Sequence, residues 1–142
     1  MNVTKLVVHH SASPRMTTTK DDLTRWHLER GFTEIGYHKV IEAEGKIVEG
    51  RVETKQGAHA QGANAGSLGV CVVGNYETEL PVPAQIDALV DVLAAWCTTH
   101  GLDSSKIYGH FDVPSGTTVT VCPGKNMRNQ LTTIRSKVQA RL

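Results

Sequence analysis

The sequence has few of the features that mark disulfide-rich, membrane-spanning or nucleic-acid-binding chains. Its three cysteines are an odd number at wide spacing, so no disulfide framework is expected. No apolar stretch approaches the roughly 18 residues needed to cross a bilayer. The formal net charge is only +1, and no basic run is present. Membrane insertion and nucleic-acid binding are therefore not expected.

The N-terminus also lacks the parts of a secretory signal peptide. The segment Met1–Lys5 has no charged start followed by a long apolar middle, and no small-residue cleavage site follows it. We therefore expect the chain to be made and held in the cytoplasm, or released by another route.

The length and composition fit one globular domain spanning residues 1–142. Hydrophobic residues make up 39% and charged residues 20% of the chain, which is enough apolar material for a core without disulfides. Strands and helices alternate in the pattern, which predicts a mixed α/β fold with a central mixed sheet flanked by about three helices. The predicted strands are 3–9, a hairpin over 36–50, 67–75 and 106–109, and the predicted helices are 20–30, 83–100 and one from about 125.

Two of the helices have clear apolar faces. Helix 83–100 begins at a proline-containing segment and ends at Gly101, as helix boundaries often do. Its apolar residues recur with a 3.6-residue period, and so do those of the last helix. The expected buried positions are Ile86, Leu89, Val90, Leu93, Trp96 and Cys97 in the first, and Met127, Leu131, Ile134 and Val138 in the second.

Two histidines and one cysteine are candidate metal ligands. His9 and His10 end an apolar strand, His110 follows another strand, and Cys122 lies in a loop before Pro-Gly. Because neighbouring side chains of a strand point to opposite faces, only one of His9 and His10 can ligate. Two imidazoles and a thiolate can hold a catalytic zinc and leave a fourth position open. From the residues alone, core or surface histidines and an inert thiol remain the alternative, and Cys71 and Cys97 are expected to be such core thiols.

A family resemblance supports the metal site. Six segments in order, spanning about residues 3–130, resemble the zinc-dependent N-acetylmuramoyl-L-alanine amidases, the family shared by bacteriophage endolysins and peptidoglycan recognition proteins. The helix segment Thr24–His27 followed by Gly31-Phe32 also resembles the phage members. The six segments are VVHHSAS, GYHKVI with EAEGKIVEGR, GAHAQGAN, SLGVCVVGNYE, GHFDV and TVCPG.

The resemblance implies a role for each matching residue. His9, His110 and Cys122 match the ligands of one zinc ion per chain, and Tyr37 matches an active-site tyrosine that hydrogen-bonds the bound water or the oxyanion. The remaining matches line the substrate cleft. These are His59, Asn64 and, less closely, Asn75. His38 is a further candidate for substrate contact, but because it follows Tyr37 and faces the other way, packing or support of the site is the favoured interpretation. Of the other histidines, His10 is expected to pack near the site, and His27 and His100 to be ordinary helix residues.

The sequence departs from the family pattern between His110 and Cys122. Eleven residues separate these ligands, more than in most relatives, and the extra residues 114–119 are expected to bulge outward and reshape the cleft rim. Phage relatives often have a lysine two positions before the cysteine, where this chain has Thr120, expected to be a weaker oxyanion donor. Asp112 is expected to brace the loop or to orient a ligand imidazole.

The resemblance implies a monomeric endolysin-type hydrolase that cuts the bond between N-acetylmuramic acid and L-alanine of peptidoglycan, cytoplasmic until lysis and then acting on the cell wall. The alternative from another class is a peptidoglycan-binding module that does not cut. Non-catalytic relatives typically lose the ligand cysteine, which this chain keeps as Cys122. Some phage members also bind a polymerase, but no basic patch or tail indicates that role here.

Overall fold

The computed structural model describes residues 1–142 and is built around one five-stranded sheet. The strand order is β3-β2-β4-β1-β5, and all neighbours are parallel except the β2–β3 hairpin. The hairpin turns at Gly45, whose φ of +86° suits glycine. The strands are β1 (Lys5–His10), β2 (Lys39–Ile41), β3 (Ile47–Glu49), β4 (Ser67–Val72) and β5 (Ile107–Gly109).

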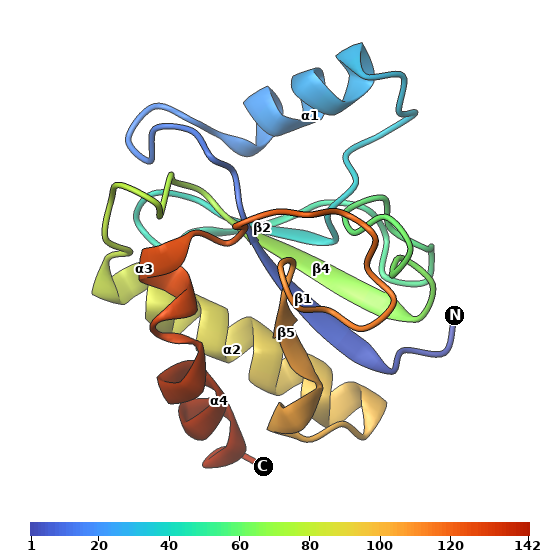
Figure 1. Cartoon of the computed structure of the whole chain (residues 1–142), viewed down its shortest axis with the longest axis vertical. Coiled ribbons are helices and arrows are strands. Elements are labelled where there is room, and N and C mark those ends of the chain that lie inside the picture. The colour runs from blue at the N-terminus through green and yellow to red at the C-terminus, as the bar shows by residue number, and fades with distance from the viewer.

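Helices cover both faces of the sheet, as a largely parallel sheet requires. Helix α2 (Pro83–His100) packs on one face together with α3 (Lys125–Arg128) and α4 (Leu131–Gln139), and α1 (Lys20–Glu29) lies on the opposite side (Figure 1). No helix combines the length and the hydrophobicity that a membrane crossing demands. The mixed α/β class is confirmed.

Helix α2 forms the larger part of the core with the bounds that the sequence predicts. All six of its predicted core residues are buried. The helix ends at Gly101, which adopts the left-handed conformation with φ +66°. Cys71 and Cys97 are also buried free thiols, as expected.

The last helix differs from the prediction because it is divided into α3 and α4. The amide of Gln130 donates to Met127 O at 2.9 Å, a tight turn that interrupts the regular pattern. The predicted apolar face nevertheless continues across the break, and its four members Met127, Leu131, Ile134 and Val138 are buried. Hydrophobic periodicity therefore located the buried face correctly but not the break in the backbone.

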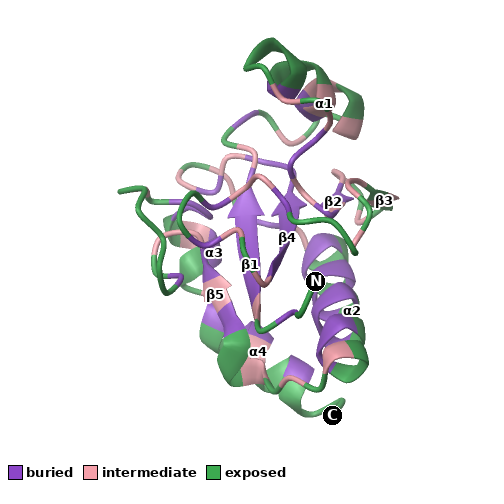
Figure 2. Cartoon of the chain, turned by 90° about the vertical axis from the view of Figure 1, so that its right-hand side faces the viewer, coloured by how far each residue is buried: buried purple, intermediate pink, exposed green.

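Helix α1 packs against the sheet through a narrow face. It begins after Thr19, whose backbone amide donates to Asp22 Oδ2 at 2.9 Å. Leu23 and His27, four residues apart, are buried, whereas Trp26 is 36% exposed. Figure 2 shows that α1 stands away from the sheet and is exposed over much of its surface.

Truncating a core leucine of α2 should destabilise the fold far more than the same change on the surface. Leu93 is fully buried and Leu80 is 71% exposed. We expect Leu93→Ala to cost about 2–5 kcal/mol of unfolding free energy, because it removes buried methyl groups and leaves a cavity. Leu80→Ala should stay within about 0.5 kcal/mol. Urea denaturation of both variants checks this, and equal losses would contradict the assigned core.

Candidate functional site

The parallel pairing of β1 with β5 brings two histidines together from opposite ends of the chain. Val8 lies opposite Gly109 in the register, and the amide of His110 continues the pairing by donating to Val8 O at 3.2 Å. The rings of His9 and His110, one residue beyond this pair, have centroids 4.7 Å apart. Both side chains thus stand at the carboxyl ends of parallel strands, a common position for sites in α/β sheets.

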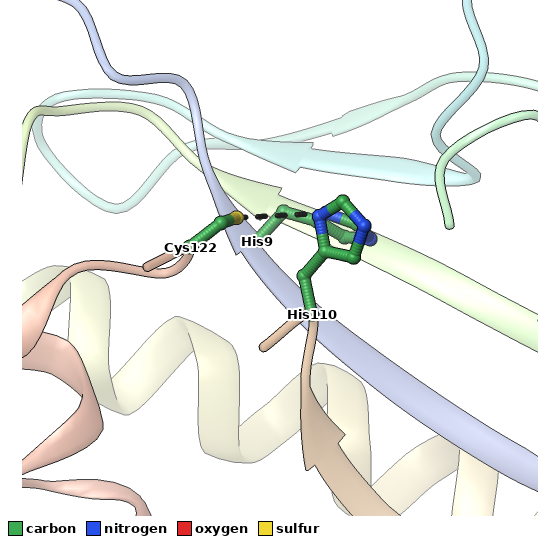
Figure 3. Close-up of side chains that lie close together, drawn as sticks. All are labelled: His9, His110 and Cys122. Atoms are coloured by element: carbon green, nitrogen blue, oxygen red, sulfur yellow. Dashed lines mark hydrogen bonds between the residues drawn. The ribbon is translucent and has the colours of Figure 1, made fainter. Parts of the chain in front are cut away.

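Cys122 completes the cluster because the loop after β5 folds back onto the sheet. The amide of Phe111 donates to Cys122 O at 2.9 Å, and the amide of His10 donates to Cys122 Sγ at 3.4 Å. Cys122 Sγ lies 3.7 Å from His9 Nδ1. The ligand atoms of His9, His110 and Cys122 all lie within 4.8 Å of one another, and Figure 3 shows the three side chains converging.

His10 lies outside this cluster, as the alternation of strand side chains predicts. Its ring is on the α2 face of the sheet, where Nδ1 accepts a hydrogen bond from the amide of Tyr76 at 3.1 Å. Its backbone amide nevertheless donates a hydrogen bond to the Cys122 sulfur. His10 therefore supports the cluster through packing and its main chain.

The donor set fits a divalent metal such as zinc. Nε2 of His110 is a buried nitrogen without a hydrogen-bond partner, an arrangement that costs free energy unless something binds it. Burial lowers the pKa of His9 and His110, so both imidazoles are neutral and can offer a lone pair at neutral pH. Burial raises the pKa of the Cys122 thiol to about 12, against the opposing effect of the His10 amide. A bound cation would favour its thiolate.

The cluster lies at a cavity of about 480 Å³ on the α1 side of the sheet. Tyr37 is part of its wall, with its ring centroid 5.1 Å from that of His9. Burial holds the pKa of Tyr37 well above 10, so its hydroxyl keeps its proton and can donate a hydrogen bond. The lining residues are His9, His27, Arg30, Phe32, Tyr37, Ala58, His59, Ala60, Gln61, Asn64, His110, Thr118 and Cys122.

Two of the predicted cleft residues, His59 and Asn64, line this cavity. Asn64 Oδ1 accepts from the amides of His59 at 2.9 Å and Ala60 at 2.8 Å, which fixes the loop between β3 and β4. His59 Nδ1 lies 2.8 Å from His9 Nε2, so this histidine contacts a ligand directly. No motif in the sequence indicates that contact.

The other two predicted cleft residues lie elsewhere. His38 is fully buried outside the cavity, where its Nδ1 accepts from the Gly69 amide at 3.1 Å and its Nε2 bonds Lys55 O at 2.8 Å. Asn75 accepts from the amide of Glu77 at 3.2 Å and shapes a turn. Both side chains thus make hydrogen bonds to backbone groups outside the cavity. For His38, packing fits this geometry better than substrate contact does.

The long link between His110 and Cys122 lies against a neighbouring loop. Its residues 114–119 are exposed, in keeping with an outward bulge, but the amide of Thr117 donates to Gln61 O at 2.9 Å. Thr118 joins the cavity wall, whereas Thr120 does not, and its Oγ1 accepts from the Cys122 amide at 3.1 Å. The predicted oxyanion donor Thr120 therefore shapes the turn that presents Cys122.

Asp112 makes the bracing contact that the sequence suggests. Its Oδ1 accepts from the amide of Gly109 at 3.0 Å, which closes the turn that carries His110. The side chain is exposed, and its hydrogen bond goes to this backbone amide rather than to a ligand imidazole. Its contribution to the site is the shape of this turn.

Sequence reasoning missed His27, Arg30 and Phe32, which form the α1 side of the cavity. His27 Nδ1 accepts from the amide of Gly36 at 2.8 Å, and the Arg30 guanidinium lies 5.0 Å from the centroid of the Phe32 ring. The resemblance of this segment to phage relatives was the available signal. Helical periodicity alone classed His27 as an ordinary helix residue because it cannot show what faces the helix.

Comparison with known proteins places the chain in a family. Residues 1–125 match the family model described as N-acetylmuramoyl-L-alanine amidase. Peptidoglycan-recognition protein SC2 of Drosophila melanogaster is 34% identical over 135 residues, which cover 89% of this chain and 71% of that protein. The endolysin of Enterobacteria phage T3 is 32% identical over 114 residues, which cover 76% and 74% respectively. The chain therefore belongs to the N-acetylmuramoyl-L-alanine amidase family.

Solved structures agree with this assignment. The endolysin amidase LysCS from Clostridium intestinale URNW superposes with a TM-score of 0.83 at 29% identity, covering 93% of this chain and 82% of that one. Drosophila PGRP-LB superposes with a TM-score of 0.79 at 30% identity, covering 91% and 79%. The fold is thus shared by endolysin amidases and recognition proteins, and the family resemblance of the sequence motifs is confirmed.

The buried His27 should make the metal-free protein less stable in mild acid. Burial, with Arg30 and Arg51 nearby, lowers the pKa of His27 from 6.5 to about 4. Between these values the unfolded chain binds a proton that the folded chain does not, so stability is present above pH 6.5 and is lost as the pH falls toward 4. This one group contributes a slope of about 1.4 kcal/mol per pH unit.

Replacing His27 with asparagine isolates this contribution. Asn Oδ1 can accept from the Gly36 amide as Nδ1 does, but asparagine does not titrate. Urea denaturation of the metal-free protein across this pH window should show a slope shallower by about 1.4 kcal/mol per pH unit in His27→Asn. An unchanged slope would mean that His27 does not titrate as its burial requires.

Proposed function

We propose that this protein is a zinc-dependent N-acetylmuramoyl-L-alanine amidase that hydrolyses the amide bond between N-acetylmuramic acid and L-alanine of peptidoglycan. The observation that carries the proposal is the cluster of His9, His110 and Cys122, whose ligand atoms lie within 4.8 Å of one another at a 480 Å³ cavity. Two histidines and one cysteine match the three-ligand sets of catalytic zinc sites. Membership of the N-acetylmuramoyl-L-alanine amidase family supports this choice of bond.

The residues around the cluster suit amide hydrolysis. A zinc ion bound there would supply a Lewis acid and lower the pKa of a bound water to about 7. Tyr37 lines the cavity beside His9 and keeps its proton, so we assign it as a hydrogen-bond donor to the oxygen that becomes negative during the reaction. The rings of His9 and His110 are neutral, so each can offer a lone pair. The hydrogen bond from the Cys122 amide to Thr120 Oγ1 fixes the turn that presents the sulfur.

The proposed biological role is lysis of the bacterial cell wall by a phage-type enzyme. Its support is the similarity to the phage T3 endolysin over 76% of this chain. In this proposal the protein is a monomer, stays in the cytoplasm until lysis, and then acts on peptidoglycan. The competing role is recognition of wall fragments without cleavage, because peptidoglycan recognition proteins are similar over a comparable share of the chain.

Replacing Cys122 with serine should abolish both zinc binding and amidase activity. Serine is close in size, but its hydroxyl is a far weaker zinc ligand than a thiolate. We expect one zinc per chain in the wild type, little zinc in Cys122→Ser, and loss of new L-alanine amino termini from isolated peptidoglycan. Atomic absorption and amino-terminal labelling measure the two quantities.

Tyr37→Phe is the matched control. It leaves all three ligands in place, so it should bind zinc as the wild type does while turnover falls by about 100-fold or more, the usual range for loss of an oxyanion donor. A wild-type protein that binds zinc and wall fragments but releases no L-alanine amino termini would favour recognition. A wild-type protein without zinc would contradict the proposed cofactor.

Zinc binding should also release about one proton near neutral pH. The histidine ligands are already neutral there, whereas burial keeps the proton on Cys122, whose pKa is raised to about 12. Apparent zinc affinity should therefore rise about tenfold per pH unit through the neutral range. Titration calorimetry in buffers of different ionisation enthalpy counts the protons, and a count near zero would mean that the thiol is already ionised in the metal-free site.

A further inference from the structure

We propose that His59 is a positioning residue that fixes the tautomer and orientation of His9, so that His9 presents a bare Nδ1 to the metal. The inference rests on the zinc site of the proposed function. It gives His59 a role different from substrate contact, the role that its sequence motif implies. The hydrogen bonds of three residues, His9, His59 and Ser67, carry it.

The contact between the two histidines is short and well defined. His9 Nε2 and His59 Nδ1 are 2.8 Å apart, and the two rings meet edge to face at 88°. One of these two nitrogens is protonated and donates the hydrogen bond to the other, and either ring can be the donor. If His9 is the donor, it is protonated on Nε2 and its Nδ1 is unprotonated. This Nδ1 lies 3.7 Å from Cys122 Sγ.

The hydrogen bond at the other ring nitrogen of His59, Nε2, determines which of the two rings is the donor. His59 Nε2 lies 3.3 Å from Ser67 Oγ, and Ser67 Oγ lies 2.7 Å from Ala63 O and 3.2 Å from Asn64 O. A carbonyl oxygen can only accept, so the single hydroxyl proton of Ser67 is directed to these carbonyls. The serine oxygen then accepts from His59 Nε2–H.

The donor and acceptor roles of His59 and His9 follow from this bond to Ser67. Because His59 carries its proton on Nε2, its Nδ1 is an acceptor, and His9 donates Nε2–H to it. The Nδ1 of His9 is therefore the lone pair that faces Cys122. Hydrogen-bonded partners of this kind hold ligand imidazoles in one tautomer and one orientation.

The fold leaves a fitted space for the His59 ring. A Cβ added at Gly69 of β4 would lie 2.6 Å from His59 Cγ and Nδ1, and one added at Gly57 would lie 2.6 Å from His59 Cδ2. Both glycines therefore allow the ring to lie directly against the backbone. Asn64 fixes the main chain of His59 by accepting from its amide. The ring is held in place from several sides.

Two substitutions at position 59 separate the hydrogen bond from mere space filling. Asparagine can place Oδ1 near the position of Nδ1 and still accept from His9, whereas leucine has a comparable bulk and accepts nothing. We expect His59→Leu to weaken zinc binding by about 10–100-fold, the range for loss of such partners. His59→Asn should stay within a few-fold of the wild type.

Competition with a chromogenic chelator measures zinc affinity without relying on activity. Thermal unfolding of the metal-free variants is the folding control. Nitrogen-15 NMR of the imidazoles in the metal-free wild type is a second readout, and it should show both His9 and His59 protonated on Nε2. A His9 ring protonated on Nδ1 would overturn the proposal.

The outcomes distinguish this inference from the proposed function. Wild-type affinity in a folded His59→Leu, or equal losses in the leucine and asparagine variants, would overturn the role of His59 while the zinc site stands. A wild-type protein that binds no zinc would remove the proposed function and this inference with it. Weaker zinc binding in His59→Leu together with near-normal binding in His59→Asn would support the proposal.

Discussion

The parallel pairing of β1 with β5 is the constraint on which the site depends. It sets Val8 opposite Gly109 and therefore places His9 beside His110, although a hundred residues separate them in sequence. A register shift of one residue would turn one of these side chains to the α2 face of the sheet. The extensive core around α2 holds that register, so the packing on one face of the sheet maintains the geometry of the candidate site on the other.

Burial gives the site its electrostatic character. His9 and His110 are held neutral, and the Cys122 thiol keeps its proton until something positive offsets the cost of the thiolate. The cluster therefore offers lone pairs from neutral groups, and His110 Nε2 is buried without a hydrogen-bond partner. Such an arrangement suits the binding of a cation. The same burial keeps Tyr37 protonated, so the cavity combines lone-pair donors with a hydrogen-bond donor.

The loop between β3 and β4 links the cavity wall to the ligand cluster. Asn64 holds the main chain of this loop, and His59 extends from it to His9. Thr117 joins the long link before Cys122 to the same loop through Gln61. The loops on this face are thus connected to one another and to the site.

The sequence by itself determined the class of fold, the bounds of α2 and the apolar faces of the helices, because the spacing of apolar residues directly reflects which side of an element is buried. Its motifs also named the three clustered residues and Tyr37. Only the tertiary structure decided that His59 bonds His9, that His27 joins the cavity, that His38 and Asn75 lie outside it, and that the last helix breaks at Asn129–Gln130. Each of these depends on hydrogen bonds or packing between segments that no local pattern relates, since a periodicity records burial and not the identity of the partner.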